Sequence, residues 1–307
     1  MRIGIITNCD FFIPLTYTLA AQQQQVYIFY SPSDDELVNQ KTKAFIKENS
    51  LPFTEEKNNS NAIYQWLLQG NYDACFVFGY NKLIEPGRLK NSTTPVFNIH
   101  FGPLPGFKGP SPVFWQLKYG LKKIGLAIHY LSNKFDEGPV VWTKDVDNLP
   151  HDNYITINQK LSSLSVEGIF YILSLIVNKL PVPVINNKDA VPAYQKRPAL
   201  GDVLINWPQM DATEICNLVR ACNPWNKGAL TLFNGYELKL MDAGIIAHQY
   251  SIAETMKPGT IMIAGDFLHI FCFGGGVINV NMFFLNDCFV PAYQCSLWGL
   301  MPGTMLG

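Results

Sequence analysis

Three polar side chains, in two short stretches of the chain, carry the chemistry that this sequence offers. Asn98 and His100 end the apolar run PVFNIH, and Asp136 begins the turn DEGPVV. Because side chains alternate along an extended strand, Asn98 and His100 point to the same face. An amide beside an imidazole can stabilise a developing oxyanion and move a proton. A carboxylate would orient or charge the imidazole, and Asp136 is the candidate for that role.

The elements that must position these side chains are strands alternating with helices. β-branched and aromatic runs occur at 2–7, 26–31, 73–78 and 95–99, and segments with helical spacing at 34–49 and 60–69. Nearly continuous apolar strands alternating with helices indicate a parallel sheet covered on both faces. Ligands of such sheets bind beyond the carboxyl ends of the strands, where Asn98 and His100 lie. We therefore expect an α/β, Rossmann-like, mostly parallel sheet.

The spacing between the two stretches also favours a shared site. A loop from 101 to 110 with three prolines joins the strand to a helix, whose start is marked by Ser111 and Pro112. A further strand is expected at 125–132. The 36 residues from His100 to Asp136 thus fit one helix and one strand, which return the chain to the same edge of the sheet.

The pattern changes in the second half of the chain. Residues 181–210 carry five prolines and little periodicity, as a linker does. Asp211 and Glu214 resemble a helix capping box, and five short strands then follow between 229 and 285. Such a series indicates a small β-barrel of the OB type. We expect a catalytic domain at 1–180, a linker at 181–206 and an OB-like domain at 207–307.

Composition narrows the class of protein further. The chain has 307 residues, 48% of them apolar, and a net charge of −1, so its overall charge does not favour a nucleic-acid or membrane partner. Its seven cysteines form no CxxC pair and no metal-type spacing with histidine, so we expect reduced thiols and no metal site. With no signal-peptide pattern and no long uncharged apolar run, we expect a cytoplasmic protein.

Together the stretches form a three-part motif. It consists of Asn98-Ile99-His100, then the loop Pro103-Leu-Pro-Gly-Phe-Lys-Gly109, then Asp136-Glu137-Gly138. This order resembles the folate-dependent formyltransferases, which include methionyl-tRNA formyltransferase, glycinamide ribonucleotide transformylase and the nucleotide-sugar formyltransferases. Residues 76–89 resemble the family's strand before the motif, and 218–240 resemble the opening of the C-terminal barrel of methionyl-tRNA formyltransferase.

The resemblance implies an enzyme that transfers the formyl group of 10-formyltetrahydrofolate to an amine. Asn98 and a protonated His100 would stabilise the oxygen of the tetrahedral intermediate, while His100 and Asp136, with a bound water, would move protons. It also implies that folate, held largely through backbone hydrogen bonds, lies in a cleft lined by Phe78, Tyr80, Leu83, Ile84, Leu104, Phe135 and Gly138.

The acceptor is the point at which this chain departs from the family. Residues 200–307 contain four Lys or Arg against eight Asp or Glu, a formal charge of −4, which disfavours tRNA. Gly102-Pro103 and Phe107-Lys108 also replace the more usual Ser-Leu and Tyr-Arg. We therefore expect a small or carrier-bound amine, such as an amino sugar nucleotide or an amino-acid derivative. The oligomeric state is not predicted.

Other interpretations remain open. The chain may be read as a divergent methionyl-tRNA formyltransferase, a non-catalytic folate-binding homologue, or a hydrolase that releases formate. Taken singly, Asn-x-His at a strand end is commonly a hydrogen-bonded pair, and Asp before x-Gly is ordinary turn chemistry. His129 sits in the middle of a predicted strand, and His248 and His269 lie in the second domain with no nearby carboxylate pattern, so we expect all three to be structural.

Overall fold

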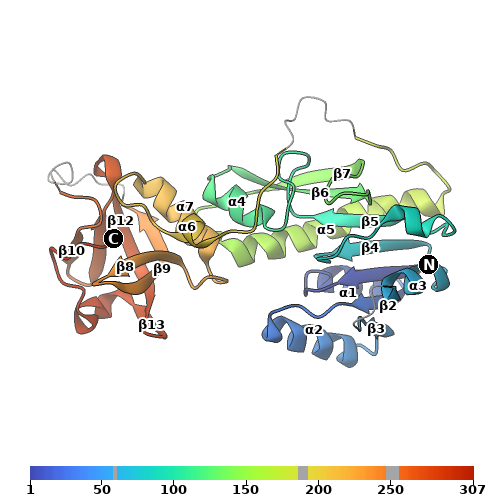
Figure 1. Cartoon of the computed structure of the whole chain (residues 1–307), viewed down its shortest axis with the longest axis horizontal. Helices are drawn as coiled ribbons and strands as arrows, with labels where there is room; N and C mark the ends of the chain where they lie inside the picture. Colours follow the sequence, from blue (N-terminus) through green and yellow to red (C-terminus); the bar gives the residue numbers. More distant parts are fainter. Residues whose placement is uncertain (58–60, 186–192, 247–255) are drawn as a thin grey trace. The chain divides into compact units, whose positions relative to one another are not determined.

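The chain forms two compact units, each assembled from several segments. A computed structural model describes residues 1–57, 61–185, 193–246 and 256–307. The first unit consists of Met1–Pro112, Gly125–Val146 and Asn158–Lys196, and the second of Val113–Ile124, Asp147–Ile157 and Arg197–Gly307 (Figure 1). The domain boundaries expected from the sequence treat each domain as one continuous range, and they remain a prediction.

A seven-stranded sheet with the order β3-β2-β1-β4-β5-β6-β7 is the centre of the first unit. Strands β1 to β5 run parallel, and β6 is antiparallel to β5. The bounds are β1 Arg2–Thr7, β2 Gln25–Tyr30, β3 Phe53–Glu55, β4 Ala74–Phe78, β5 Val96–His100, β6 Lys123–Tyr130 and β7 Val140–Asp147. Every residue of β4 is buried, as expected for a strand covered on both faces.

Helices cover both faces of this sheet and bury the side chains that alternate along its strands. Phe29 and Val77 pack with the buried side of α3, while α1 and α2 meet through the edge-on rings of Phe12 and Phe45. The helices are α1 Ile13–Ala21, α2 Glu36–Glu48, α3 Ala62–Gln69 and α5 Tyr154–Val177, with a 3-10 turn η1 at Pro86–Leu89. Helix α2 starts where its apolar face begins, because the carboxylate of Asp35 accepts the N–H groups of Leu37 and Val38.

Helix α5 has the length and apolar composition of a membrane-crossing helix. Its buried side nevertheless packs within the protein. Ile157, Leu161, Ile169 and Ile172 have no exposed surface, and Gly168 is closely covered by Trp142. The composition of α5 is therefore also that of a core helix in a folded domain.

The second unit is built on an antiparallel sheet. Its order is β10-β11-β12-β9-β8, and β13 pairs with β12. The strands are β8 Ala229–Phe233, β9 Tyr236–Ile245, β10 Ile261–Ala264, β11 Phe267–Phe271, β12 Val277–Leu285 and β13 Cys288–Pro291. The helices are α4 Pro112–Lys118, α6 Leu200–Val203 and α7 Ala212–Cys222, with 3-10 turns η2 Phe273–Gly275 and η3 Ala292–Trp298. Asp211 and Glu214 form the predicted reciprocal capping box of α7.

The predicted fold class is confirmed: a mostly parallel α/β sheet with helices, followed by a separate antiparallel β unit. The short strands β3 and β13, the strand β7 and the antiparallel direction of β6 were not predicted. Of the histidines expected to be structural, His269 lies on β11 and is 7% exposed, and burial lowers its pKa. His248 lies outside the described residues.

A buried carboxylate sits just beyond the carboxyl end of β3. Glu56 is 8% exposed and accepts hydrogen bonds from Ser31 (2.7 Å), Tyr80 (2.8 Å) and Lys82 (2.9 Å). Burial acts to raise the pKa of Glu56, but these three hydrogen bonds outweigh it and lower the pKa. The ionised carboxylate therefore ties the ends of β2, β3 and β4 together.

We expect Glu56→Gln to lower the free energy of unfolding by about 1 to 3 kcal/mol at pH 7, because the charge-assisted hydrogen bonds are lost. The pKa of Glu56 in the folded state lies below the unfolded value of 4.5. Ionised Glu56 therefore stabilises the protein above pH 4.5, and this stabilisation is lost as the pH falls through the folded pKa. Urea unfolding should therefore show the difference between wild type and variant shrinking from pH 7 to pH 3.

The neighbouring Glu55→Gln is the matched control. Glu55 forms a 2.7 Å ion pair with Lys43 in which both side chains are well exposed, so its loss should cost under about 1 kcal/mol. Equal losses in the two variants, or a Glu56→Gln loss that does not change with pH, would contradict the role given to Glu56.

Candidate active site

Two of the three predicted catalytic side chains end strand β5. Asn98 and His100 lie on one face of the strand, and the antiparallel register with β6 places Asn98 opposite His129 and His100 opposite Ala127. His100 is 6% exposed and His129 is 2% exposed. The end of β5, with its neighbour β6, thus presents a partly buried amide and two buried imidazoles rather than one.

Asp136 reaches these side chains from the turn that follows β6. Its carboxylate oxygen Oδ1 lies 3.3 Å from His100 Nδ1, 3.5 Å from Asn98 Nδ2 and 3.6 Å from His129 Nε2. Its other oxygen, Oδ2, accepts the backbone N–H of Gly109 at 2.8 Å. The structure therefore brings the predicted Asn98, His100 and Asp136 together, and it adds His129 and the proline-rich loop.

The glycines of the motif permit this close approach. A Cβ atom on Gly138 would lie 1.6 Å from the carbonyl oxygen of Tyr130, so only glycine lets the turn pack on β6. Gly109 has a φ of 109°, and a Cβ there would lie 2.1 Å from the carbonyl oxygen of Gln195. Each glycine thus fixes the position of a segment that contacts Asp136.

The proline-rich loop is paired with a segment just before the second unit. Ala193 donates its N–H to the carbonyl of Pro105 at 3.1 Å and accepts the N–H of Lys108 at 3.0 Å, and Gln195 donates to Lys108 at 2.7 Å. We call residues 193–195 the strap. Because the strap contacts residues 105–108, it helps to set the loop that carries Gly109.

His100 has a defined proton arrangement. Its Nε2 lies 2.6 Å from the carbonyl oxygen of Phe107, which can only accept, so Nε2 carries the hydrogen. Burial lowers the pKa of His100, against the opposing effects of Asp136 and that carbonyl. The neutral ring then has its lone pair on Nδ1, facing the carboxylate, and a proton arriving at Nδ1 gains a hydrogen bond to Asp136.

Asp136 remains ionised in this buried setting. Its side chain is 10% exposed, and burial acts to raise its pKa. The polar groups that surround the carboxylate outweigh burial, and together they lower the pKa of Asp136. The site therefore holds a neutral imidazole next to a permanent negative charge.

Sequence reasoning missed the place of His129. The strand at 125–132 was predicted, but its direction was not, and the direction decides which neighbour faces Asn98. In an antiparallel pair, residues opposite each other share a face, so the register puts His129 beside Asn98. Had an antiparallel β5–β6 pair been assumed, the spacing of Asn98 and His129 would have been the available signal.

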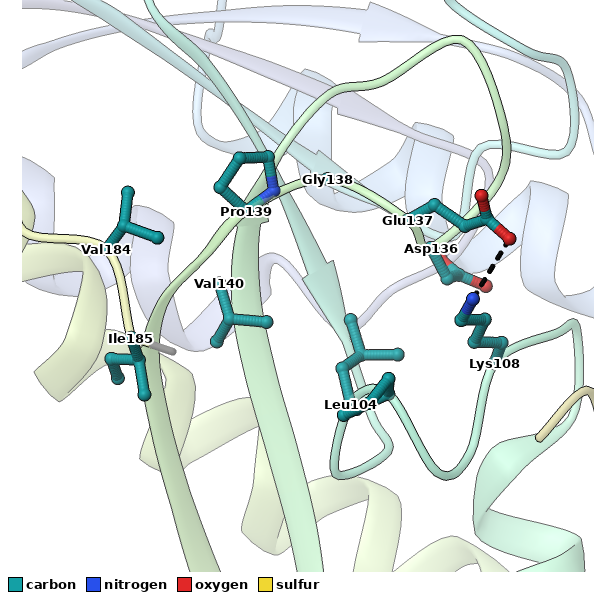
Figure 2. A pocket seen from close by; sticks show the side chains of 10 residues that line it. Leu104, Lys108, Asp136, Glu137, Gly138, Pro139, Val140, Val184 and Ile185 are labelled. Carbon is teal, nitrogen blue, oxygen red and sulfur yellow. Dashed lines mark hydrogen bonds and ion pairs between the residues drawn. The ribbon is translucent and has the colours of Figure 1, made fainter. Parts of the chain in front are cut away.

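A cavity of about 480 Å³ opens beside Asp136 (Figure 2). One side is apolar, and the mouth carries the ion pair between Lys108 and Glu137, 2.9 Å apart. The lining residues are Leu104, Pro105, Lys108, Asp136, Glu137, Gly138, Pro139, Val140, Val184 and Ile185. A volume of this size and a mostly apolar wall suit an organic ligand with a ring system.

The residues expected to contact folate divide into two groups. Leu104 and Gly138 line the cavity. Phe78, Tyr80 and Ile84 are 2%, 9% and 4% exposed and pack in the core, Leu83 is half-buried, and Phe135 is exposed. Within the part of the chain that the structure describes, no cluster of three His, Cys, Asp or Glu side chains could hold a metal ion.

Comparisons with known proteins identify the family of this chain. The model of the family described as Formyl transferase matches residues 18–173, and the model of its C-terminal domain matches residues 201–283. The chain therefore belongs to the formyl transferase family, and the resemblance to folate-dependent formyltransferases is confirmed.

The similar proteins include methionyl-tRNA formyltransferases. That of Pelotomaculum thermopropionicum is 28% identical over 67% of this chain, which spans only 63% of that relative's length. That of Geobacter metallireducens is 26% identical over 97% of this chain and 96% of its own. Among solved structures, the sugar 3N-formyl transferase WlaRD superposes with a TM-score of 0.67 at 15% identity, covering 91% of this chain and 97% of that one, a likeness of fold.

The expectation that tRNA is disfavoured is wrong, because the similar curated proteins are methionyl-tRNA formyltransferases. The charge count used a continuous range, whereas the second unit also contains 113–124 and 147–157. These segments add Lys118, Lys122 and Lys123, and with Arg197 the unit has eight basic against ten acidic residues, a formal −2. Moreover, phosphate contacts are local and do not require a basic domain overall.

We expect Asp136→Asn to lower the pKa of His100 further, because the carboxylate charge favours the imidazolium form. An NMR titration of the His100 ring should show its midpoint at a lower pH than in the wild type. Glu137→Gln, in the next residue and paired with Lys108, is the control and should leave the midpoint nearly unchanged. A midpoint that stays or rises in Asp136→Asn would show that Asp136 does not act on His100.

Proposed function

We propose that this protein is an N-formyltransferase that moves the formyl group of 10-formyltetrahydrofolate to an amine. The proposal rests on one observation: Asp136 lies within 3.5 Å of both His100 and Asn98, beside a cavity with an apolar side. The family match supports the reaction class. A cytoplasmic location, with a catalytic region at 1–180, a linker at 181–206 and a C-terminal region at 207–307, belongs to the same proposal.

Asn98 acts on the oxygen of the formyl group. When the amine attacks the formyl carbon, a C–N bond forms and negative charge develops on that oxygen. The amide hydrogen of Asn98 that now faces Asp136 at the long distance of 3.5 Å would donate to the oxygen instead. Because Asn98 is partly buried, this donor is worth more than it would be in water.

His100 acts on the proton of the attacking nitrogen. In its neutral form the ring holds its lone pair on Nδ1, so it would accept a proton from the tetrahedral intermediate, with a water as relay. The resulting imidazolium is stabilised by Asp136 at 3.3 Å. The proton then passes to the nitrogen of the folate leaving group, and the C–N bond to the donor breaks. The low pKa of His100 thus favours the base role over the predicted oxyanion contact.

The folate donor would occupy the cavity beside Asp136. Leu104, Val140 and Ile185 provide apolar contacts for its rings, and the turn at Gly138 offers backbone groups. The remaining predicted contacts, Phe78, Tyr80, Leu83, Ile84 and Phe135, stay part of the proposal. Phe78, Tyr80 and Ile84 would act by supporting the site from the core, since they are already buried.

Methionyl-tRNA is the first acceptor to test. A methionyl-tRNA formyltransferase aligns with this chain over nearly the full length of both. A small or carrier-bound amine, such as an amino sugar on a nucleotide or an amino-acid derivative, is the second candidate. It is favoured by the loop, in which Gly102-Pro103 and Phe107-Lys108 replace the family's more usual residues.

We expect Asn98→Ala, His100→Ala and Asp136→Ala to reduce kcat for formyl transfer by on the order of 10² to 10³ each. His151→Ala, which removes an exposed histidine, is the matched control and should keep the wild-type rate. Release of tetrahydrofolate from 10-formyltetrahydrofolate gives the rate, and thermal unfolding confirms that each variant is folded. A folded triad variant with wild-type activity would refute the proposed roles.

The acceptors are separated by the same assay with charged initiator tRNA and with a panel of amino sugar nucleotides and amino-acid amines. Transfer to tRNA should fall steeply with salt, since phosphate contacts release counterions. Transfer to a small amine should be far less dependent on salt. Donor consumption without any acceptor would point to hydrolysis, and no consumption with any acceptor would leave a non-catalytic folate-binding protein.

A further inference from the structure

His129 is held by two hydrogen bonds that use both of its ring nitrogens. Nδ1 lies 2.7 Å from the carbonyl oxygen of Tyr130, the next residue along the strand. Nε2 lies 3.0 Å from the amide nitrogen Nδ2 of Asn98, directly across the β5–β6 pair. Only 2% of the His129 surface is exposed, so the ring makes little contact with solvent.

The partners decide which nitrogen carries the hydrogen. A backbone carbonyl can only accept, so Nδ1 donates to Tyr130. In the neutral ring Nε2 then has a lone pair, and it accepts a hydrogen from the Asn98 amide. The alternative, in which Nε2 donates to Asp136, is disfavoured because that distance is 3.6 Å against 3.0 Å to Asn98.

This arrangement fixes the orientation of the Asn98 amide. An amide group has an acceptor and a donor end of nearly the same shape, and a turn about its last bond exchanges them. An acceptor at Nε2 holds the donor end towards His129 and Asp136. The second hydrogen of the same NH₂ group has only the long 3.5 Å contact with Asp136 Oδ1, which an oxygen that develops negative charge would replace.

We propose that His129 is a positioning residue for formyl transfer: its Nε2 lone pair accepts one N–H of the Asn98 amide and so presents the other N–H to the reacting oxygen. The proposal rests on the proposed function, in which Asn98 is the oxyanion donor. His129 does not serve as a base, because the amide and the carbonyl occupy both ring nitrogens. The charged and titratable groups facing the ring are Asp136 from the turn and His100 from β5.

The tight turn after β6 supports the same arrangement. A Cβ on Gly138 would lie 3.0 Å from His129 Nδ1 as well as 1.6 Å from the Tyr130 carbonyl. The glycine therefore leaves room for the Nδ1–H bond that sets the ring's tautomer. Through the hydrogen bond between His129 and Tyr130, the turn that carries Asp136 also helps to orient the Asn98 amide.

A double-mutant cycle tests the proposal. We expect His129→Leu, which has no acceptor, to lower kcat by about 10- to 100-fold with KM for the formyl donor changed by less than about 3-fold. His129→Gln, whose Oε1 stands near the place of Nε2, should keep kcat within about 5-fold of wild type. In the Asn98→Ala background, His129→Leu should change kcat by less than about 2-fold, because the amide it positions is gone.

Two results would overturn the proposal. One is a folded His129→Leu variant with wild-type kcat, and the other is a full additional loss when His129→Leu is combined with Asn98→Ala. Should His129→Leu fail to fold, His129→Val, which also lacks an acceptor and suits a strand, gives the same comparison alone and combined with Asn98→Ala.

An NMR measurement separates this proposal from the proposed function. Long-range proton–nitrogen spectra of the wild-type protein at pH 8 should show the Nδ1–H tautomer for His129, and an Nε2–H tautomer would refute the arrangement. If the wild type transfers no formyl group to any acceptor while the Nδ1–H tautomer is found, the proposed function fails and the hydrogen-bond assignment stands.

Discussion

The carboxylate of Asp136 is the constraint on which the site depends. A buried negative charge needs polar partners, and Asp136 accepts the Gly109 N–H of the proline-rich loop and lies 3.3 to 3.6 Å from polar atoms of β5 and β6. The position of each segment therefore depends on the same two oxygen atoms. In return, the carboxylate holds a neutral imidazole, an amide and a backbone N–H in one small volume. The site is built by satisfying a charge, and the geometry needed for catalysis follows from that.

The parts of the site that could be predicted from the sequence are those governed by a short-range rule. Asn98 and His100 share a face because strands alternate. Asp136 was predicted from a rule for parallel strands, and although β6 is antiparallel, the turn after it still reaches His100. The direction of β6 follows no such rule, because it depends on which strand it pairs with. His129 was missed for that reason. The contribution of 113–124 and 147–157 to the second unit is likewise a matter of tertiary packing, which no local pattern encodes.

The argument from net charge against a tRNA acceptor failed for the same reason. Summed over a stretch of sequence, charge describes solubility and long-range attraction, while recognition of a phosphate depends on which side chains share a surface. Lys118, Lys122 and Lys123 lie far in sequence from the strands of the second unit and yet belong to it. A charge count made before the fold is known therefore assigns charged residues to the wrong structural unit.

The strap of residues 193–195 has a consequence for how the chain can be divided. Its hydrogen bonds with Pro105 and Lys108 make it a part of the loop that delivers the Gly109 N–H to Asp136. A fragment that stops at the end of the long helix would contain every proposed catalytic side chain and still lack the backbone that holds this loop. The proposed site is for that reason not a portable module: excising or transplanting it requires the cut to fall after residue 195, within a segment that the sequence alone presents as a linker.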